Sequence, residues 1–176
     1  MAKVTEKELD KAIEEAFKSD PNFTRWFLSK TKFSSENATY HWSRSDHPWS
    51  RVEILAENPK TGVVEKVTKE GETDILVVFQ TDAGRKVAIH LENKIAAGKF
   101  TLGQPELYVA RAESWVGNPK YCSYEDYEII LIAPLAFYER NTIDAKKFGC
   151  YVAHEEIAAY IPIFSQLNKS VHVEGL

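Results

Sequence analysis

Apolar residues recur every three to four positions between residues 9 and 17, and this period predicts an amphipathic helix. Thr5 and Glu8 form a capping box in front of it, and Pro21 marks its end. The aromatic residues within 23–27 indicate a second short helix. The chain is therefore expected to begin with two helices.

The middle of the chain contains short apolar runs that are typical of strands. Residues 73–80 (TDILVVFQ) and 127–138 (YEIILIAPLAFY) are rich in β-branched residues, as expected for strands buried on both faces. Residues 85–94 (RKVAIHLENK) return as a strand after the turn at 81–84, and residues 51–57 indicate one more strand. These runs predict a sheet with a buried centre.

The remaining segments complete the expected order of elements. Residues 34–50 are polar and aromatic without a clean period, which predicts a loop. Residues 104–116 predict a helix with Pro105 at its first position, and residues 149–164 predict a short strand leading into a helix. Helices, strands, helix, strand and helix in this order predict one α/β domain over residues 1–176, with helices on both faces of a central mixed sheet.

Composition narrows the class of protein. A chain of 176 residues that is 44% hydrophobic suits one domain with its own core. Its apolar runs stay well below the roughly 18 residues that span a bilayer, so we expect no membrane partner. The polar N-terminus lacks a signal-peptide core, and Cys122 and Cys150 are too few for a disulfide framework or a zinc finger. The expected location is the cytoplasm.

The net charge of −4 argues against a protein that coats nucleic acid through bulk basicity. It is compatible with a local basic cleft, for which Lys94, Lys99 and Arg111 are candidates. The alternative is that these residues are merely solvated surface.

The predicted hairpin brings two acids together. If residues 82–84 form a three-residue loop with its glycine in the left-handed conformation, Thr81 faces Arg85. Asp74 then falls opposite Glu92, and facing carboxylates repel each other unless a cation lies between them. Oxygen ligands of this kind suit Mg²⁺ or Mn²⁺.

Other interpretations of these residues remain open at this point. Lys94 lies one pleat beyond Glu92 and would sit beside a metal bound there. Alternatively, Asp74 only brackets a turn, and Glu92 with Lys94 is a solvated strand end. His90 lies on the same face as Glu92, and we expect a partly buried residue with satisfied hydrogen bonds rather than a metal ligand.

The order of polar residues in this region resembles the PD-(D/E)XK nuclease superfamily, whose fold is restriction-endonuclease-like. It is most similar to the RecB-type branch, which has a glutamine-x-x-x-tyrosine motif after the lysine. The resemblance covers residues 72–115, and Thr73 stands where most members have proline. The residues that carry it are Asp74, Glu92, Asn93, Lys94, Gln104 and Tyr108.

The resemblance implies an α-β-β-β-α-β core and metal-dependent hydrolysis of phosphodiester bonds in nucleic acid, DNA more than RNA. Asp74 and Glu92 would hold one or two Mg²⁺ or Mn²⁺ ions, with the carbonyl of Asn93 as a further ligand. Lys94 would orient the attacking water and neutralise charge in the transition state.

The resemblance also implies roles outside the metal site. Gln104 and Tyr108, one helical turn apart, would contact substrate or order the site. Members often take an acid from the first helix, for which Glu14 and Glu15 are candidates that we leave unassigned. Members also often form homodimers or join larger complexes. The alternative function is a module that keeps the fold without catalysis and binds nucleic acid or protein.

Overall fold

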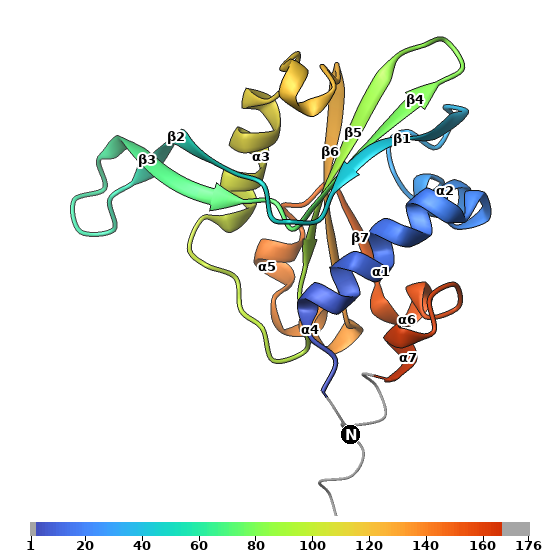
Figure 1. The fold of residues 1–176 in the computed structure, drawn as a ribbon. Coiled ribbons are helices and arrows are strands. Elements are labelled where there is room, and N and C mark those ends of the chain that lie inside the picture. The colour runs from blue at the N-terminus through green and yellow to red at the C-terminus, as the bar shows by residue number, and fades with distance from the viewer. Residues whose placement is uncertain (1–2, 167–176) are drawn as a thin grey trace, which may run out of the picture.

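Five strands form one mixed sheet in the computed structural model, which describes residues 3–166 (Figure 1). The first three strands in sheet order are antiparallel neighbours, and the last two continue parallel to the third. In sheet order the strands are β1 (Ala38–Arg44), β4 (Ile75–Thr81), β5 (Lys86–Asn93), β6 (Asp126–Ala133) and β7 (Cys150–Ala153). The predicted α/β class with a central mixed sheet is confirmed.

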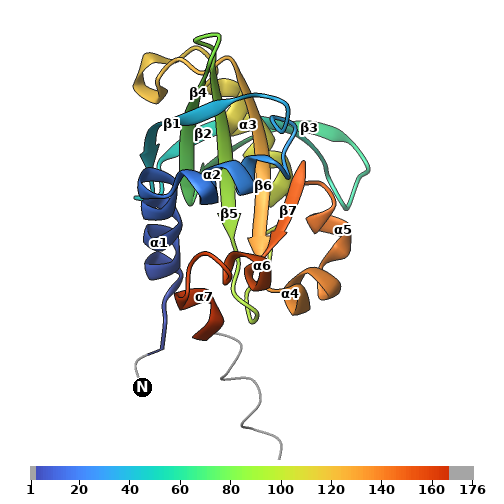
Figure 2. The ribbon, with the colours of Figure 1, turned by 90° about the vertical axis from the view of Figure 1, so that its right-hand side faces the viewer.

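Helices cover both faces of this sheet, as predicted (Figures 1 and 2). The N-terminal and C-terminal helices share a core with one face: α1 (Glu6–Ser19), α2 (Pro21–Leu28), α6 (His154–Ile157) and α7 (Ile163–Gln166). The other face carries α3 (Gln104–Ser114), α4 (Leu135–Arg140) and α5 (Thr142–Ala145), with the short 3₁₀ helix η1 (Pro119–Tyr121) nearby. None of the described helices is both long enough and apolar enough to cross a membrane.

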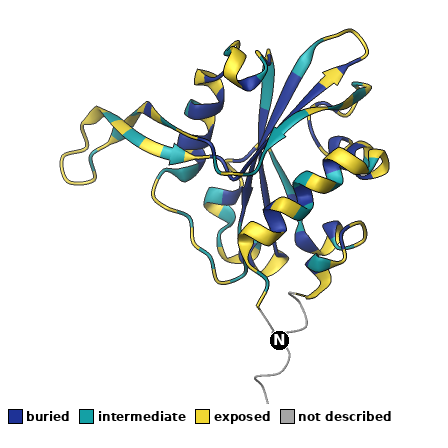
Figure 3. Ribbon diagram, in the orientation of Figure 1, coloured by how far each residue is buried: buried dark blue, intermediate teal, exposed yellow. Residues whose placement is uncertain are grey.

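The sequence of strand β4 is continuously apolar from Ile75 to Phe79 because the strand is buried on both of its faces. Ile75, Val77 and Phe79 pack into the core under α1 and α2, whereas Leu76 and Val78 pack on the opposite face. Each of these side chains is fully buried, and Figure 3 shows the central strands buried along most of their length. Burial on both faces removes the polar alternation of a surface strand.

The β4–β5 hairpin has the predicted register. Ile75 pairs with Leu91 and Gln80 with Lys86, and Gly84 has the left-handed φ of +78° that the loop requires. This register sets Asp74 opposite Glu92, one residue beyond the last pair.

A separate two-stranded sheet, which follows β1 and precedes β4 in the chain, projects from the body (Figure 1). It consists of β2 (Trp49–Glu57) and β3 (Val64–Glu72), and its base packs against α3. The strand predicted at 51–57 therefore exists but lies outside the central sheet. The β3 segment was not predicted, because it alternates charged residues with few apolar ones and most of its residues are exposed.

The prediction of a loop over 34–50 is wrong, because this segment contains β1 at the edge of the sheet. A bulge between Tyr40 and Trp42 shifts the phase of the strand by one residue. The shift breaks the period-two alternation by which a strand is recognised in sequence.

Two predicted boundaries also shift. The strand predicted over 127–138 ends at Ala133, since Pro134 has no N–H for the sheet and begins the turn into α4 instead. Helix α3 starts at Gln104 rather than at Pro105 and ends at Ser114. The strand-then-helix prediction for 149–164 is confirmed as β7 followed by α6 and α7.

Candidate active site

Asp74 lies immediately before β4, at the end of the sheet where β5 finishes. Its carboxylate is buried, and its Oδ2 accepts a hydrogen bond from the main-chain N–H of Asn93 at 2.8 Å. The N–H of Asp74 donates in turn to the hydroxyl of Tyr108 at 3.1 Å. The carboxylate of Asp74 is thus held by the end of β5, and its main-chain N–H is held by Tyr108 of α3.

Charge and burial act together on Asp74. Burial raises the pKa of its carboxyl group well above the ordinary value, and the nearby negative charge of Glu92 raises it further. The hydrogen bond from Asn93 works in the opposite direction but does not outweigh them. The carboxyl group of Asp74 therefore resists ionisation unless a cation compensates it.

Glu92 is only 3% exposed and accepts two hydrogen bonds on one oxygen. Its Oε1 lies 2.7 Å from Nζ of Lys94 and 2.8 Å from Nε2 of Gln104. The Lys94 ammonium group also lies 5.6 Å from the centre of the Phe100 ring. The structure therefore brings Glu92, Lys94 and Gln104 into direct contact.

Gln104 and Tyr108 take different positions at the start of α3. The amide of Gln104 is half-buried between Glu92 and the main-chain N–H of Thr101, which donates to its Oε1 at 3.1 Å. Tyr108 is only 1% exposed, and its hydroxyl donates to the carbonyl of Leu91 at 3.2 Å. Tyr108 thus joins the start of β4 to β5 from inside the protein.

His47 is a site residue that the sequence did not reveal. It lies in the loop between β1 and β2 with a left-handed φ of 54°. Its Nε2 is 3.0 Å from Oδ2 of Asp10, and its Nδ1 is 3.0 Å from Oε1 of Glu72 and 3.6 Å from Oδ1 of Asp74. Burial alone lowers the pKa of His47, but the hydrogen bonds to Glu72 and Asp10 outweigh it and raise the pKa.

Asp10 is the acid that the first helix contributes. It is 1% exposed, and its Oδ1 accepts from the side-chain amide of Asn93 at 2.7 Å. The two acids considered from sequence lie elsewhere, since Glu14 accepts hydrogen bonds from Ser43 and Ser45 and Glu15 is exposed. A signal for Asp10 was present, because it is an acid next to Leu9 on the apolar face of the helix.

The side chain of Asn93 joins two helices to the end of β5. Besides donating to Asp10, it accepts from Nε2 of His154 at 2.8 Å through Oδ1. His154 is fully buried, and burial lowers its pKa to about 3, so the ring is neutral. Among the described residues its Nδ1 has no hydrogen-bond partner. The side chain of Asn93 therefore holds these elements together. The metal-ligand role that the resemblance implies for this residue concerns its main-chain carbonyl instead.

A buried cation lies behind the two acids. Arg111 is 1% exposed; its Nε donates to the hydroxyl oxygen of Thr73 at 2.9 Å, and its Nη2 donates to the carbonyl of Glu72. No carboxylate of a described residue lies within salt-bridge distance of it. Arg111 therefore belongs neither to a basic surface cleft with Lys94 and Lys99 nor to the solvated surface, because it is internal.

His90 is a satisfied buried residue, as favoured from sequence. The hydroxyl of Thr73 lies 3.1 Å from its Nδ1, and the hydroxyl of Tyr124 lies 3.1 Å from its Nε2. Burial, with a smaller contribution from Arg111, lowers the pKa of His90 to about 3. Both nitrogens are occupied, so this ring has no free position for a metal ion.

One group of side chains has the geometry of a cation site. His47, Glu72 and Asp74 each offer a ligand atom, and these atoms all lie within 4.8 Å of one another. A neutral imidazole carries one N–H, so it can donate to only one of the carboxylates that face its two nitrogens. If that N–H goes to Asp10, Nδ1 presents a lone pair to Glu72 and Asp74, and a proton or a cation must lie between them.

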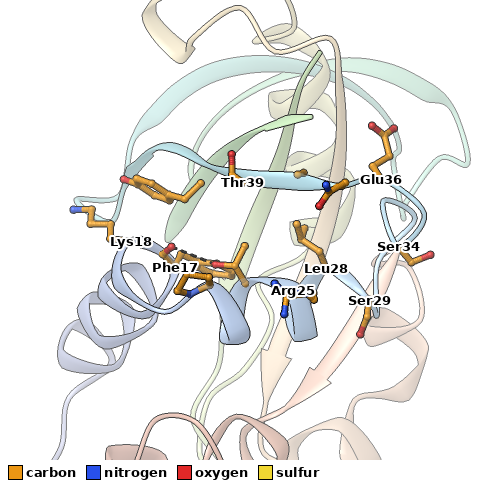
Figure 4. Close-up of a pocket in the computed structure, with 13 residues that line it drawn as sticks. Phe17, Lys18, Arg25, Leu28, Ser29, Ser34, Glu36 and Thr39 are labelled. Atoms are coloured by element: carbon orange, nitrogen blue, oxygen red, sulfur yellow. Dashed lines mark hydrogen bonds between the residues drawn. The ribbon is translucent and has the colours of Figure 1, made fainter. Parts of the chain in front are cut away.

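A cavity of about 350 Å³ lies apart from this group, between α2 and β1 (Figure 4). Phe17 and Leu28 line it together with Lys18, Arg25 and Glu36. It contains none of the site residues described above, so we do not assign it to the candidate active site.

Comparison of the chain with protein-family models, with curated proteins and with solved structures finds no match.

Proposed function

We propose that the protein is a metal-dependent nuclease that hydrolyses phosphodiester bonds in nucleic acid, with DNA the favoured substrate. The observation that carries this proposal is the convergence of Asp74, Glu92 and Lys94 at the ends of two central strands. Two buried carboxylates beside a lysine are costly for a fold, and such groups are typical of catalytic sites.

The order of the elements supports the same proposal. When α2, the β2–β3 hairpin and the short η1 are set aside, the order is α1, β1, β4, β5, α3 and β6, which supports the α-β-β-β-α-β core that the resemblance implies. The β2–β3 hairpin is an insertion between the first two of these strands.

The donor set fits a divalent cation. Carboxylate oxygens of Asp74 and Glu72 suit Mg²⁺ and Mn²⁺, and the imidazole of His47 favours a transition metal such as Mn²⁺. Asp10 would orient His47 from its other nitrogen, as carboxylates commonly do for metal-binding histidines. A bound ion would acidify a water molecule and stabilise charge on the attacked phosphate.

The chain's own residues supply the remaining functions. Glu92 completes the negative charge of the site and positions the ammonium group of Lys94 at 2.7 Å. That ammonium group is a compact point charge, suited to a non-bridging phosphate oxygen or to the attacking water. Gln104, at the start of α3, donates to the same oxygen of Glu92, so the distance between Glu92 and Lys94 is fixed.

The test is a cleavage assay with Mg²⁺ or Mn²⁺ on single-stranded and double-stranded DNA and RNA. Asp74→Asn and Lys94→Ala should each lower the rate by roughly a hundred-fold or more. Lys60→Ala changes an exposed lysine, and Asp144→Asn changes a partly exposed aspartate that pairs with Lys147; both lie outside the candidate site and serve as controls.

Wild type that cleaves none of these substrates with either metal would refute the proposal. Binding of nucleic acid in chelator without any cleavage would instead support the module that keeps the fold without catalysis.

A further inference from the structure

A second hollow opens beside His47, with a volume of about 470 Å³. It lies where the end of β1, the start of β2 and η1 meet. The side chains that matter for its chemistry are Arg44, Asp46, His47, Trp49, Lys120 and Tyr121. Because His47 also contacts Asp10, Glu72 and Asp74, the hollow adjoins the candidate active site through this residue.

The charge of this hollow differs from that of the chain. Arg44 and Lys120 are positive and Asp46 is negative, so the lining carries +1 with His47 neutral, whereas the chain carries −4. Arg44 donates from Nε and Nη2 to the two oxygens of Asp46, at 2.8 Å each, which fixes the plane of the guanidinium group. No described carboxylate lies within salt-bridge distance of Lys120. A fixed guanidinium group and an unpaired ammonium group favour an anion with several oxygens.

Aromatic rings accompany these cations. Trp49 is 62% exposed at the first position of β2, an unusual exposure for so large an apolar side chain. Tyr121 stacks on Trp115 with ring centres 4.0 Å apart, and Nε1 of Trp115 donates to the hydroxyl of Ser50 at 3.1 Å. One wall of the hollow is therefore rigid, and an exposed indole stands at its rim.

The hollow lies beside the residues to which the proposed reaction is assigned. A phosphate held beside Asp74 lies next to His47, whose Nδ1 is 3.6 Å from the Asp74 carboxylate. The neighbouring nucleotide of the same strand would then reach the hollow. In a duplex both faces of a base are covered by its neighbours, whereas an unpaired base can stack on an aromatic side chain.

We propose that this hollow binds one nucleotide of an unpaired strand, with its phosphate at Arg44 and Lys120 and its base on Trp49. The proposal rests on the proposed function and adds that the substrate enters as a single strand. Binding to bases through stacking is tolerant of sequence, so little sequence preference is expected.

The experiment measures binding in chelator, where no cleavage occurs. The probe is a fluorescently labelled oligothymidylate of about 12 nucleotides, followed by anisotropy. Trp49→Ala should weaken binding roughly 5-fold to 150-fold, and Trp49→Phe should retain most of the affinity. Lys120→Ala should weaken binding and lower the slope of log affinity against log salt by about 0.7.

Controls come from the same hairpin. Leu55 is 70% exposed on β2, and Lys66 is exposed on β3, so Leu55→Ala and Lys66→Ala remove equivalent side chains away from the hollow. Neither should change binding of the oligonucleotide. A duplex of the same length should lose much less affinity than the single strand on Trp49→Ala.

Two results would overturn the proposal: unchanged single-strand affinity in Trp49→Ala, or an equal loss for the duplex. The proposed function fails separately, in the cleavage assay with metal. Loss of binding in Trp49→Ala together with an inactive wild type would retain the hollow and reject the nuclease. Cleavage by wild type together with unchanged binding in Trp49→Ala would support the nuclease and reject the hollow as a nucleotide site.

Discussion

The main-chain N–H of Asn93 donates to Oδ2 of Asp74 at 2.8 Å, and this bond joins the two strand ends that carry the candidate site. The main-chain pairing of β4 and β5 ends at Ile75 and Leu91, and the bond from Asn93 to Asp74 adds one side-chain contact beyond that pair. Asp74 is therefore both an acceptor within the fold and a charge that the fold tolerates poorly.

This dual role gives a prediction for Asp74→Asn. The asparagine keeps an oxygen for the N–H of Asn93 and removes the repulsion from Glu92, so the variant should be inactive yet more stable than wild type in chelator. Facing like charges cost roughly 0.2–1 kcal/mol at a sheet surface, and burial increases this cost. Thermal melting in chelator measures the difference.

The pH dependence of that difference has a definite sign. Since the pKa of Asp74 is raised in the folded state, its contribution is fully present below the ordinary value of 3.8 and is lost as pH rises through the raised value. The stability gap between Asp74→Asn and wild type should thus open as pH increases above 3.8. A variant that melts below wild type at neutral pH would contradict this account.

Tyr108→Phe should destabilise the fold. Its hydroxyl serves the N–H of Asp74 and the carbonyl of Leu91 inside the protein, and removing it leaves both groups unpaired. A buried unsatisfied group costs about 1–3 kcal/mol, measurable by urea unfolding. Tyr138→Phe is the control, since Tyr138 stacks on Tyr151 and its hydroxyl has no hydrogen-bond partner among the described residues. Equal stability of the two variants would show that the bridge contributes nothing.

Metal binding should depend on Asp74 and, selectively, on His47. In calorimetric titrations Asp74→Ala should abolish Mn²⁺ binding. His47→Ala should weaken Mn²⁺ more than Mg²⁺, because imidazole suits transition metals whereas Mg²⁺ prefers oxygen. His41→Ala, at an exposed position of β1, is the matched control. Full Mn²⁺ affinity in Asp74→Ala would remove the basis for the site.

Gln104→Ala should lower kcat/KM for cleavage while leaving Mn²⁺ affinity unchanged. Nε2 of Gln104 donates to Oε1 of Glu92, and Gln104 is not part of the group formed by His47, Glu72 and Asp74. The comparison needs kinetics and calorimetry on the same preparation. A parallel loss of both quantities would mean that Gln104 supports the metal site directly.

The parts of the fold that the sequence could predict are those governed by local rules. Hairpin register follows from loop length, so the pairing of residues across β4 and β5 was accessible, and so was the position of Asp74 relative to Glu92. The bulge in β1 and the charged pattern of β3 concealed two strands, because each departs from the alternation that identifies a half-buried strand.

The site residues that were missed are those brought in over a distance. His47 comes from a loop that lies 27 positions before Asp74 in the chain, and no spacing rule connects the two. Asp10 was accessible in principle, as an acid on the buried face of a helix, whereas Glu14 is partly buried against Ser43 and Ser45 and Glu15 is exposed.

The two ends of the β2–β3 hairpin, which we call its anchors, lie at the candidate site. Its turn lies at the opposite end of the strand pairing. His47 precedes β2 by two residues and Glu72 ends β3, while the pairing runs without interruption from Trp49–Glu72 to Glu57–Val64. The turn at 58–63 is therefore the place where this protein can accept foreign sequence. A reporter or a longer ribbon inserted there would extend the hairpin outward and leave both anchors in register.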